Sequence, residues 1–272
     1  MKRIGLLGCG AIGTQIALAI DSGKIPATLT HVYDIERSQA DNLVSKLKQK
    51  PEVVTNSHLL SSNAVELVVE AASQNAVRND AVSILQNKKD MMIMSAGALL
   101  DESVFEVISD ACRDFGKTVY LPSGAIAGLD ALKAVKDELE SVVLVTTKNP
   151  NSLKGAPFFD SSDIDPEKIS ESTVLFDGTA KEAVSLFPKN VNVSALLSLV
   201  GLGGNNTSVR IVADPSTDKN THEVEANGKF GNLKITVENV PDSTTPKTSR
   251  LATLSAVELL RQICTKEVQI GT

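Results

Sequence analysis

The stretch KRIGLLGCGAIG, residues 2–13, decides the fold. Its first six residues form a short apolar run typical of a buried β-strand, and helical apolar spacing follows over residues 10–20. Gly8, Gly10 and Gly13 give the pattern GxGxxG between the two elements. The first glycine of such a pattern makes a tight turn, the second lets the backbone approach a pyrophosphate, and the third lets helix and strand pack closely. The stretch therefore predicts a dinucleotide-binding strand–turn–helix unit.

The same pattern predicts further cofactor contacts. Ala11 and Ile12 lie inside the motif, where free N–H groups at the start of the helix face the phosphate charge. Asp34 follows Gly13 by about 20 residues and ends a second predicted strand, where a carboxylate accepts hydrogen bonds from the adenine ribose. Its charge would repel a 2′-phosphate and so favours NAD, although Arg37, three residues later, could offset that repulsion and admit NADP. The alternative, a tight turn without a ligand, is less favoured because glycine destabilises a helix start unless something needs the space.

The segment EAAS, residues 70–73, lies at the carboxyl end of another predicted strand. A doubly wound sheet places its ligand-contacting loops at such ends, so Ala72 and Ser73 are cofactor-binding candidates. The alternative is a plain strand end in which Ser73 caps the next helix.

Strand-like and helix-like segments alternate over residues 1–121 at the rhythm of βαβ units. We expect strands at 2–7, 29–33, 67–70, 91–95 and 118–121, and helices at 10–20, 36–47, 75–85 and 102–115. The predicted fold class is α/β, with a Rossmann-type doubly wound parallel sheet in a dinucleotide-binding domain of residues 1–121 and a second mixed α/β domain.

The second domain is expected at residues 122–249 and would carry catalysis and dimerisation. Its predicted elements are a glycine-rich turn at 123–128, helices at 129–139 and 193–200, strands at 142–147 and 209–213, a surface loop at 149–166, and a hairpin of 224–226 with 233–237. Apolar residues at spacings of three and four then predict an amphipathic closing helix from Arg250, in a C-terminal segment of residues 250–272.

Composition excludes several classes of protein. The 272 residues are 42% hydrophobic and carry a net charge of −6, which is typical of a soluble chain with a proper core. A pI near 5.2 gives no basic field for nucleic acid or an anionic membrane surface. No apolar run reaches the roughly 18 residues that cross a bilayer. Three dispersed cysteines form no CxxC pair, so we expect no metal, no disulfide framework and a cytoplasmic location. Hydrolase and metalloenzyme motifs do not occur in the sequence.

A proton-transferring residue near neutral pH is most often histidine, and the chain has three. His31 falls inside a predicted strand and is interpreted as a packed residue, and His58 is interpreted as a solvated loop residue. His222 lies in the loop-like segment DPSTDKNTHEV, where polar residues converge, and is the predicted catalytic acid or base. The alternative is an ordinary turn histidine.

A substrate carboxylate needs a cation. Lys247, flanked by Thr248 and Ser249, is the predicted substrate-binding cluster. The alternative is a solvated lysine ahead of a helix cap.

Five segments together resemble the L-aspartate dehydrogenase family, over nearly the whole chain. They are GCGAIG at the start, LPSGAIAGLDAL at 121–132, FPKNVNVSA at 187–195, VADPSTDKNTHEV at 212–224 and VPDSTTPKTS at 240–249.

The resemblance implies NAD(P)-dependent oxidation of L-aspartate to iminoaspartate, which hydrolyses to oxaloacetate and ammonia or supplies NAD biosynthesis. It implies that His222 is the catalytic acid or base and that Ala125 and Asn192 bind the cofactor, with Asn190 as the competing choice for the second position. It also implies a homodimer formed through the sheet of the second domain.

Two alternatives remain open at the level of sequence. One is a related imine reductase, similar to dihydrodipicolinate reductase, although that family's paired histidines are absent here. Homoserine dehydrogenase-like enzymes rely on lysines in a different sequence context, and only Lys247 of this chain could be compared with those lysines. The other is a non-catalytic NAD-binding redox sensor. Fold analogy does not separate these classes, because function depends on the site.

Overall fold

The structure is a computed structural model that describes residues 1–188, 192–241 and 249–268. The chain divides into two compact units. The first comprises Met1–Pro122 with the described residues from Thr253 onward, and the second comprises Ser123–Ala252. No described helix is long and apolar enough to span a membrane.

The first unit contains a six-stranded parallel sheet in the order β3-β2-β1-β4-β5-β6. Its strands are β1 (Lys2–Leu7), β2 (Ala27–Tyr33), β3 (Glu52–Val53), β4 (Leu67–Glu70), β5 (Asp90–Ile93) and β6 (Val119–Tyr120). Its helices are α1 (Ala11–Asp21), α2 (Arg37–Ser45), α3 (Gln74–Gln86), α4 (Glu102–Phe115) and α10 (Arg250–Cys264), the last beginning in the second unit. The strand order reverses between β1 and β4, so the prediction of a Rossmann-type doubly wound sheet is confirmed.

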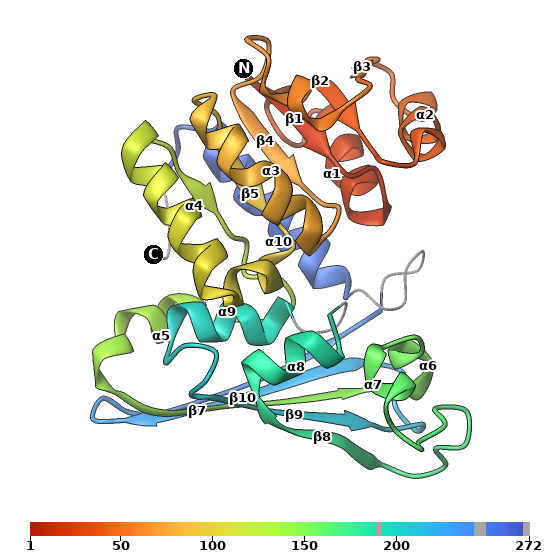
Figure 1. Cartoon of the computed structure of the whole chain (residues 1–272), viewed down its shortest axis with the longest axis vertical. Coiled ribbons are helices and arrows are strands. Elements are labelled where there is room, and N and C mark those ends of the chain that lie inside the picture. Colours follow the sequence, from red (N-terminus) through yellow and green to blue (C-terminus); the bar gives the residue numbers. More distant parts are fainter. Residues whose placement is uncertain (189–191, 242–248, 269–272) are drawn as a thin grey trace. The chain divides into compact units, whose positions relative to one another are not determined.

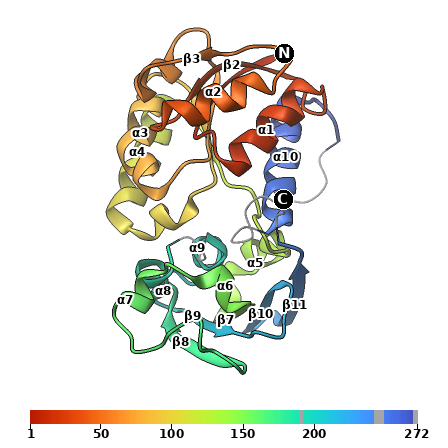
Figure 2. The same cartoon turned by 90° about the vertical axis from the view of Figure 1, so that its right-hand side faces the viewer.

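Helices cover both faces of this sheet. Figure 2 shows α3 and α4 on one side and α1 and α10 on the other. The sheet forms one hydrophobic core with the helices on the α1 and α10 side, and α10 contributes Ala256, Val257 and Leu260 to it. The closing helix therefore packs into the first unit, although residues 123–252 separate it from the rest of that unit in sequence.

The second unit contains a five-stranded mixed sheet in the order β11-β10-β7-β9-β8. Its strands are β7 (Leu139–Lys148), β8 (Thr173–Thr179), β9 (Thr207–Ala213), β10 (Asn220–Gly228) and β11 (Gly231–Asn239), and only the β7 and β9 pair is parallel. Its helices are α5 (Leu129–Ala134), α6 (Pro150–Leu153), α7 (Pro157–Asp160), α8 (Ala180–Leu186) and α9 (Asn192–Val200). Figure 1 shows α5, α8 and α9 on the same face of the sheet.

Three expectations for this unit are wrong. The helix expected at 129–139 ends at Ala134, because Leu139 already pairs as the first residue of β7, which bonds β10 and β9 on its two sides. The loop expected at 149–166 contains α6 and α7, each with a proline in its first turn. Strand β10 begins at Asn220, four residues before the expected strand.

Candidate functional site

The glycine loop after β1 has the geometry that its sequence predicts. Gly8 adopts φ +101°, and a Cβ there would lie 2.6 Å from the Ala71 carbonyl group. A Cβ at Gly13 would lie 2.1 Å from the Gly8 carbonyl oxygen, so helix and turn touch at this point. A Cβ at Gly10 would meet no heavy atom of the described chain within 4 Å. Gly8 and Gly13 are therefore required by the fold, whereas Gly10 keeps open a space that the chain does not fill.

That open space lies at the start of α1. Gly10 is the N-cap residue, and among the described residues no side chain bonds the free N–H groups of the first turn, which contains Ala11, Ile12 and Gly13. Such a helix start binds anionic groups through its N–H groups and its dipole. The residues present thus fit the pyrophosphate of a dinucleotide.

Asp34 follows β2 and lies against this loop. Its Oδ2 accepts the Cys9 N–H at 2.7 Å and its Oδ1 accepts the Glu36 N–H at 2.9 Å. These two hydrogen bonds hold the Asp34 carboxylate beside the loop, and its remaining lone pairs are able to accept hydrogen bonds from ribose hydroxyls. Burial and then the Asp34 charge raise the pKa of the neighbouring Cys9 thiol to about 12, so this cysteine stays protonated.

The segment after β4 is fixed by a buried carboxylate. Glu70 Oε1 accepts the Ala72 N–H at 2.8 Å and the Ser95 hydroxyl at 2.9 Å, and Oε2 accepts the N–H groups of Met94 and Ser95. Ser73 caps α3 by accepting the Ala76 N–H at 3.2 Å. The capping alternative for Ser73 is therefore present, and Glu70 joins the loops after β4 and β5 at the carboxyl edge of the sheet.

His222 lies inside β10 and not in a loop, so the expectation of a loop histidine is wrong. It pairs with Thr146 of β7 and Val237 of β11 across the sheet, and its side chain is 2% exposed. The Thr146 hydroxyl lies 3.0 Å from Nδ1. The polar run that suggested a loop ends at Lys219, and from Asn220 onward every second side chain of β10 points to the buried face.

A lysine lies on the same buried face. Lys148, the last residue of β7, is 3% exposed, and burial lowers its pKa to about 8. Burial, and then the Lys148 charge, lower the pKa of His222 to about 3. The imidazole is consequently neutral near pH 7 and lies in the field of a neighbouring ammonium group.

Comparison with known proteins places both units. Residues 130–263 match the family model described as aspartate dehydrogenase, C-terminal, and residues 8–122 match the homoserine dehydrogenase NAD-binding domain model. The L-aspartate dehydrogenase of Nitrosopumilus maritimus is 66% identical over all of both chains. The chain belongs to the L-aspartate dehydrogenase family. The resemblance of the sequence to this family is thereby confirmed.

Other relatives agree with that assignment. The L-aspartate dehydrogenase of Methanocella arvoryzae is 46% identical, again over all of both chains. The crystal structure of aspartate dehydrogenase from Thermotoga maritima is 29% identical, covers 99% of each chain and superposes with a TM-score of 0.77.

The family's two cofactor positions in the second unit stay predictions. Ala125 is buried in the turn before α5, where its carbonyl oxygen accepts the Asn239 amide at 2.9 Å. Asn192 is the first residue of α9, and the competing Asn190 lies outside the described residues.

The predicted carboxylate-binding cluster is described only in part. Lys247 and Thr248 lie outside the described residues. Ser249 is buried, and its hydroxyl accepts the Asn220 amide at 3.3 Å. In this L-aspartate dehydrogenase family member, Ser249 is therefore hydrogen-bonded to the strand β10 that contains His222.

Sequence reasoning missed Lys148, Thr146 and Asn220. Thr146 and Lys148 could have been predicted from sequence. They continue the period of two set by Val142 and Leu144, which places all four side chains on one face of a strand. A lysine at the end of such a buried row is unusual, since lysine is rarely fully buried.

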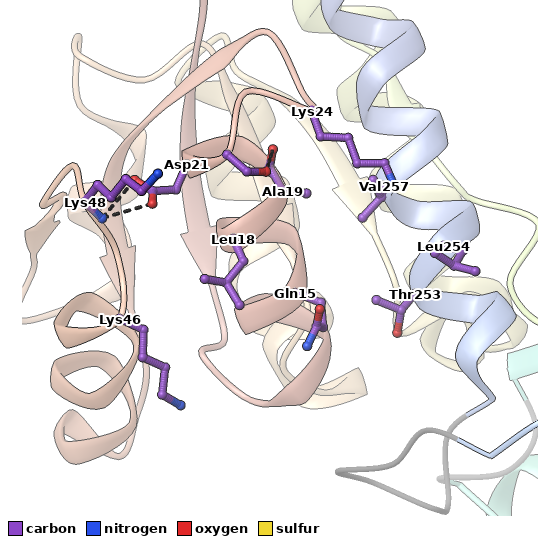
Figure 3. Close-up of a pocket in the computed structure, with 11 residues that line it drawn as sticks. Gln15, Leu18, Ala19, Asp21, Lys24, Lys46, Lys48, Thr253, Leu254 and Val257 are labelled. Carbon is purple, nitrogen blue, oxygen red and sulfur yellow. Dashed lines mark hydrogen bonds between the residues drawn. The ribbon is translucent and has the colours of Figure 1, made fainter.

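A surface pocket of about 450 Å³ in the first unit lies apart from these residues. Figure 3 shows its lining residues on α1 and α10, with Lys46 and Lys48 just after α2 and the Asp21 carboxylate bonded to the Lys48 backbone N–H. None of the predicted site residues lines it. Within the described ranges, no group of three His, Cys, Asp or Glu side chains is arranged to hold a metal.

Proposed function

We propose that this protein catalyses the NAD(P)-dependent oxidation of L-aspartate to iminoaspartate, which water then converts to oxaloacetate and ammonia. The balanced first step consumes L-aspartate and NAD⁺ and yields iminoaspartate, NADH and one proton. The observation that carries the proposal is the buried His222, bonded to Thr146 and close to the Lys148 charge, in the unit that matches the aspartate dehydrogenase model.

The chain's own part in this reaction is positioning and proton transfer. When bound, a nicotinamide ring supplies the acceptor for the hydride of the substrate α-carbon. Formation of the C=N bond requires the substrate nitrogen to lose protons, and neutral His222 would accept one. If Nδ1–H donates to the Thr146 hydroxyl, the lone pair lies on Nε2. The two substrate carboxylates would raise the pKa of His222 from about 3, because nearby negative charge favours the imidazolium form.

NAD is the proposed physiological cofactor, held at Gly8, Gly10, Gly13 and Asp34. Asp34 would repel a 2′-phosphate, and the Arg37 guanidinium, which was expected to offset that repulsion, pairs with Asp41 at 3.2 Å. We further propose that the enzyme also catalyses the reverse reductive amination and supplies iminoaspartate for NAD biosynthesis in the cytoplasm.

A homodimer through the second sheet is part of the proposal. Among the described elements, α5, α8 and α9 cover one face of that sheet (Figure 1), whereas Val143, Val145 and Val212 face the other and are half-buried. An aliphatic centre of this kind suits a self-complementary two-fold interface. Sedimentation equilibrium should give a dimer that Val145→Glu dissociates, and a monomeric unaltered chain would exclude this interface.

The activity test is NADH formation at alkaline pH, followed by absorbance. L-Aspartate should react, whereas D-aspartate, L-glutamate, L-alanine and L-homoserine should not, and NAD should exceed NADP in kcat/KM. NADH binding without turnover of any amino acid would favour the redox sensor, and turnover of a cyclic imine instead would favour the imine reductase.

Matched histidine variants test the site. His222→Gln should lose about 10²- to 10⁴-fold in kcat with NADH affinity retained, as removal of a general acid or base does. His58→Gln, at an exposed position, should leave both quantities unchanged. Full activity in His222→Gln would remove His222 from the mechanism.

A further inference from the structure

The ends of β7 and β10 bring a second pair of polar side chains to the buried face that carries His222. Thr146 pairs with His222, and Thr147 with Thr221, in the antiparallel register of the two strands. Lys148 and Asn220 each lie one residue beyond that last pair, and the alternation along both strands puts their side chains on the same face as His222. Both side chains are almost completely enclosed, with 3% and 1% exposure respectively.

Asn220 presents a hydrogen-bond acceptor into this enclosed region. Its amide nitrogen donates to Ser249 Oγ at 3.3 Å, whereas Oδ1 is buried and has no hydrogen-bond partner among the described residues. Buried amide oxygens in native proteins are nearly always bonded, and an exception requires an explanation such as a functional role or a bound water or ion. A ligand that satisfies this oxygen would present an N–H or O–H donor.

Lys148 supplies the complementary chemistry. A lysine ammonium has three donors and carries a positive charge, so it can bind a carboxylate. Its charge also reaches His222, whose pKa it lowers. One small face of the sheet therefore combines a cation, an unsatisfied acceptor and a proton-accepting imidazole. An α-amino acid matches all three, because its carboxylate pairs with the cation while its amino group can donate to the acceptor and lose a proton to the imidazole.

We propose that Lys148 and Asn220 are substrate-binding residues, with the Lys148 ammonium binding a substrate carboxylate and Asn220 Oδ1 accepting a hydrogen bond from the substrate amino group. The assignment rests on the proposed amino-acid dehydrogenase function. It places a buried cation for a substrate carboxylate on β7. It also gives Asn220 the role of holding the nitrogen that His222 deprotonates.

Succinate separates the two roles, because it has carboxylates but no amino group. Its binding to the enzyme–NADH complex is measured by the change in NADH fluorescence, which needs no turnover. Lys148→Met should raise the succinate Kd and the L-aspartate KM by about 10- to 150-fold, as loss of a charged hydrogen bond does. Asn220→Leu should raise the L-aspartate KM about 10-fold or more and leave the succinate Kd unchanged.

Two further variants complete the design. Lys234→Met, at an exposed position of β11 in the same sheet, should change neither quantity. Asn220→Asp keeps an acceptor and should bind L-aspartate better than Asn220→Leu does. Unchanged succinate affinity in a folded Lys148→Met variant overturns the assignment of Lys148, and equal losses of succinate and L-aspartate binding in Asn220→Leu overturn that of Asn220.

A measurement on the unaltered chain covers a variant that fails to fold. Reductive methylation of Lys148, mapped by mass spectrometry, should slow when succinate saturates the enzyme–NADH complex, and an unchanged rate contradicts the proposal. If the unaltered enzyme oxidises no L-aspartate but binds succinate through Lys148, the proposed function fails while the carboxylate site stands.

Discussion

Replacement of Lys148 by methionine should stabilise the protein at neutral pH and not at high pH. The folded-state pKa of about 8 lies below the ordinary 10.5, so the unfolded chain binds a proton that the folded chain binds more weakly. The stability contributed by the neutral amine is complete above pH 10.5 and is lost as the pH falls through 8. The linkage cost of the buried charge is about 3 kcal/mol at pH 7 and less than half of that at pH 9.5.

The assay compares Lys148→Met with the unaltered chain by urea unfolding at these two pH values. Far-UV circular dichroism is the probe, because the chain has no tryptophan and its two tyrosines, Tyr33 and Tyr120, both lie in the first unit. The stability difference between the two proteins should shift by about 2 kcal/mol between pH 7 and pH 9.5 in favour of the lysine. Titrating groups that the Lys148 charge does not influence cancel in this double difference, and His222, with a pKa of about 3, stays neutral at both pH values. A constant difference across the pH range would therefore refute the buried-charge argument.

Three further predictions follow from the site geometry. Gly13→Ala should lower the melting temperature, because its Cβ would lie 2.1 Å from the Gly8 carbonyl oxygen. Gly10→Ala should leave the melting temperature unchanged and weaken NADH binding in a fluorescence titration. Equal effects of the two substitutions in both assays would contradict the open space at Gly10. Glu70→Gln should destabilise the fold by about 1–3 kcal/mol in urea unfolding, since an amide NH₂ would replace an oxygen that accepts N–H donors, and no change would count against the carboxylate clamp. The pKa of His222 is lowered from 6.5 to about 3, so stability should fall as the pH drops below 6.5, by about 2 kcal/mol at pH 5, and His222→Gln should lack that loss.

The first unit could be predicted from sequence because its signals are local. The glycine motif fixes strand, turn and helix within a dozen residues, and the apolar runs of the parallel strands are buried on both faces, as β4 is. The two-residue strand β3 was not predicted, since only its pairing with β2 defines it.

The second unit was harder because its pattern depends on partners far away in sequence. The prediction placed His222 in a loop because polar residues precede it, and only the pairing with Thr146, more than 70 residues earlier, makes it a strand residue. The substrate-binding cation was predicted at Lys247 because its sequence neighbours are polar. Lys148 was not predicted, because it ends a row of apolar residues.

The pattern along β7 and β10 explains why these buried polar groups persist. Toward one end of the pair, Val142, Leu144, Val224 and Ala226 fill the buried face and stabilise the sheet in the ordinary way. At the other end the same face changes to Thr146, Lys148, Asn220 and His222. Replacement of buried charged groups by well-packed hydrophobic residues is often neutral or stabilising, so stability alone does not account for these side chains. The two adjacent strands change from apolar to polar side chains at neighbouring positions of the same face. This pattern is expected where a sheet stops packing against its own core and binds a polar ligand.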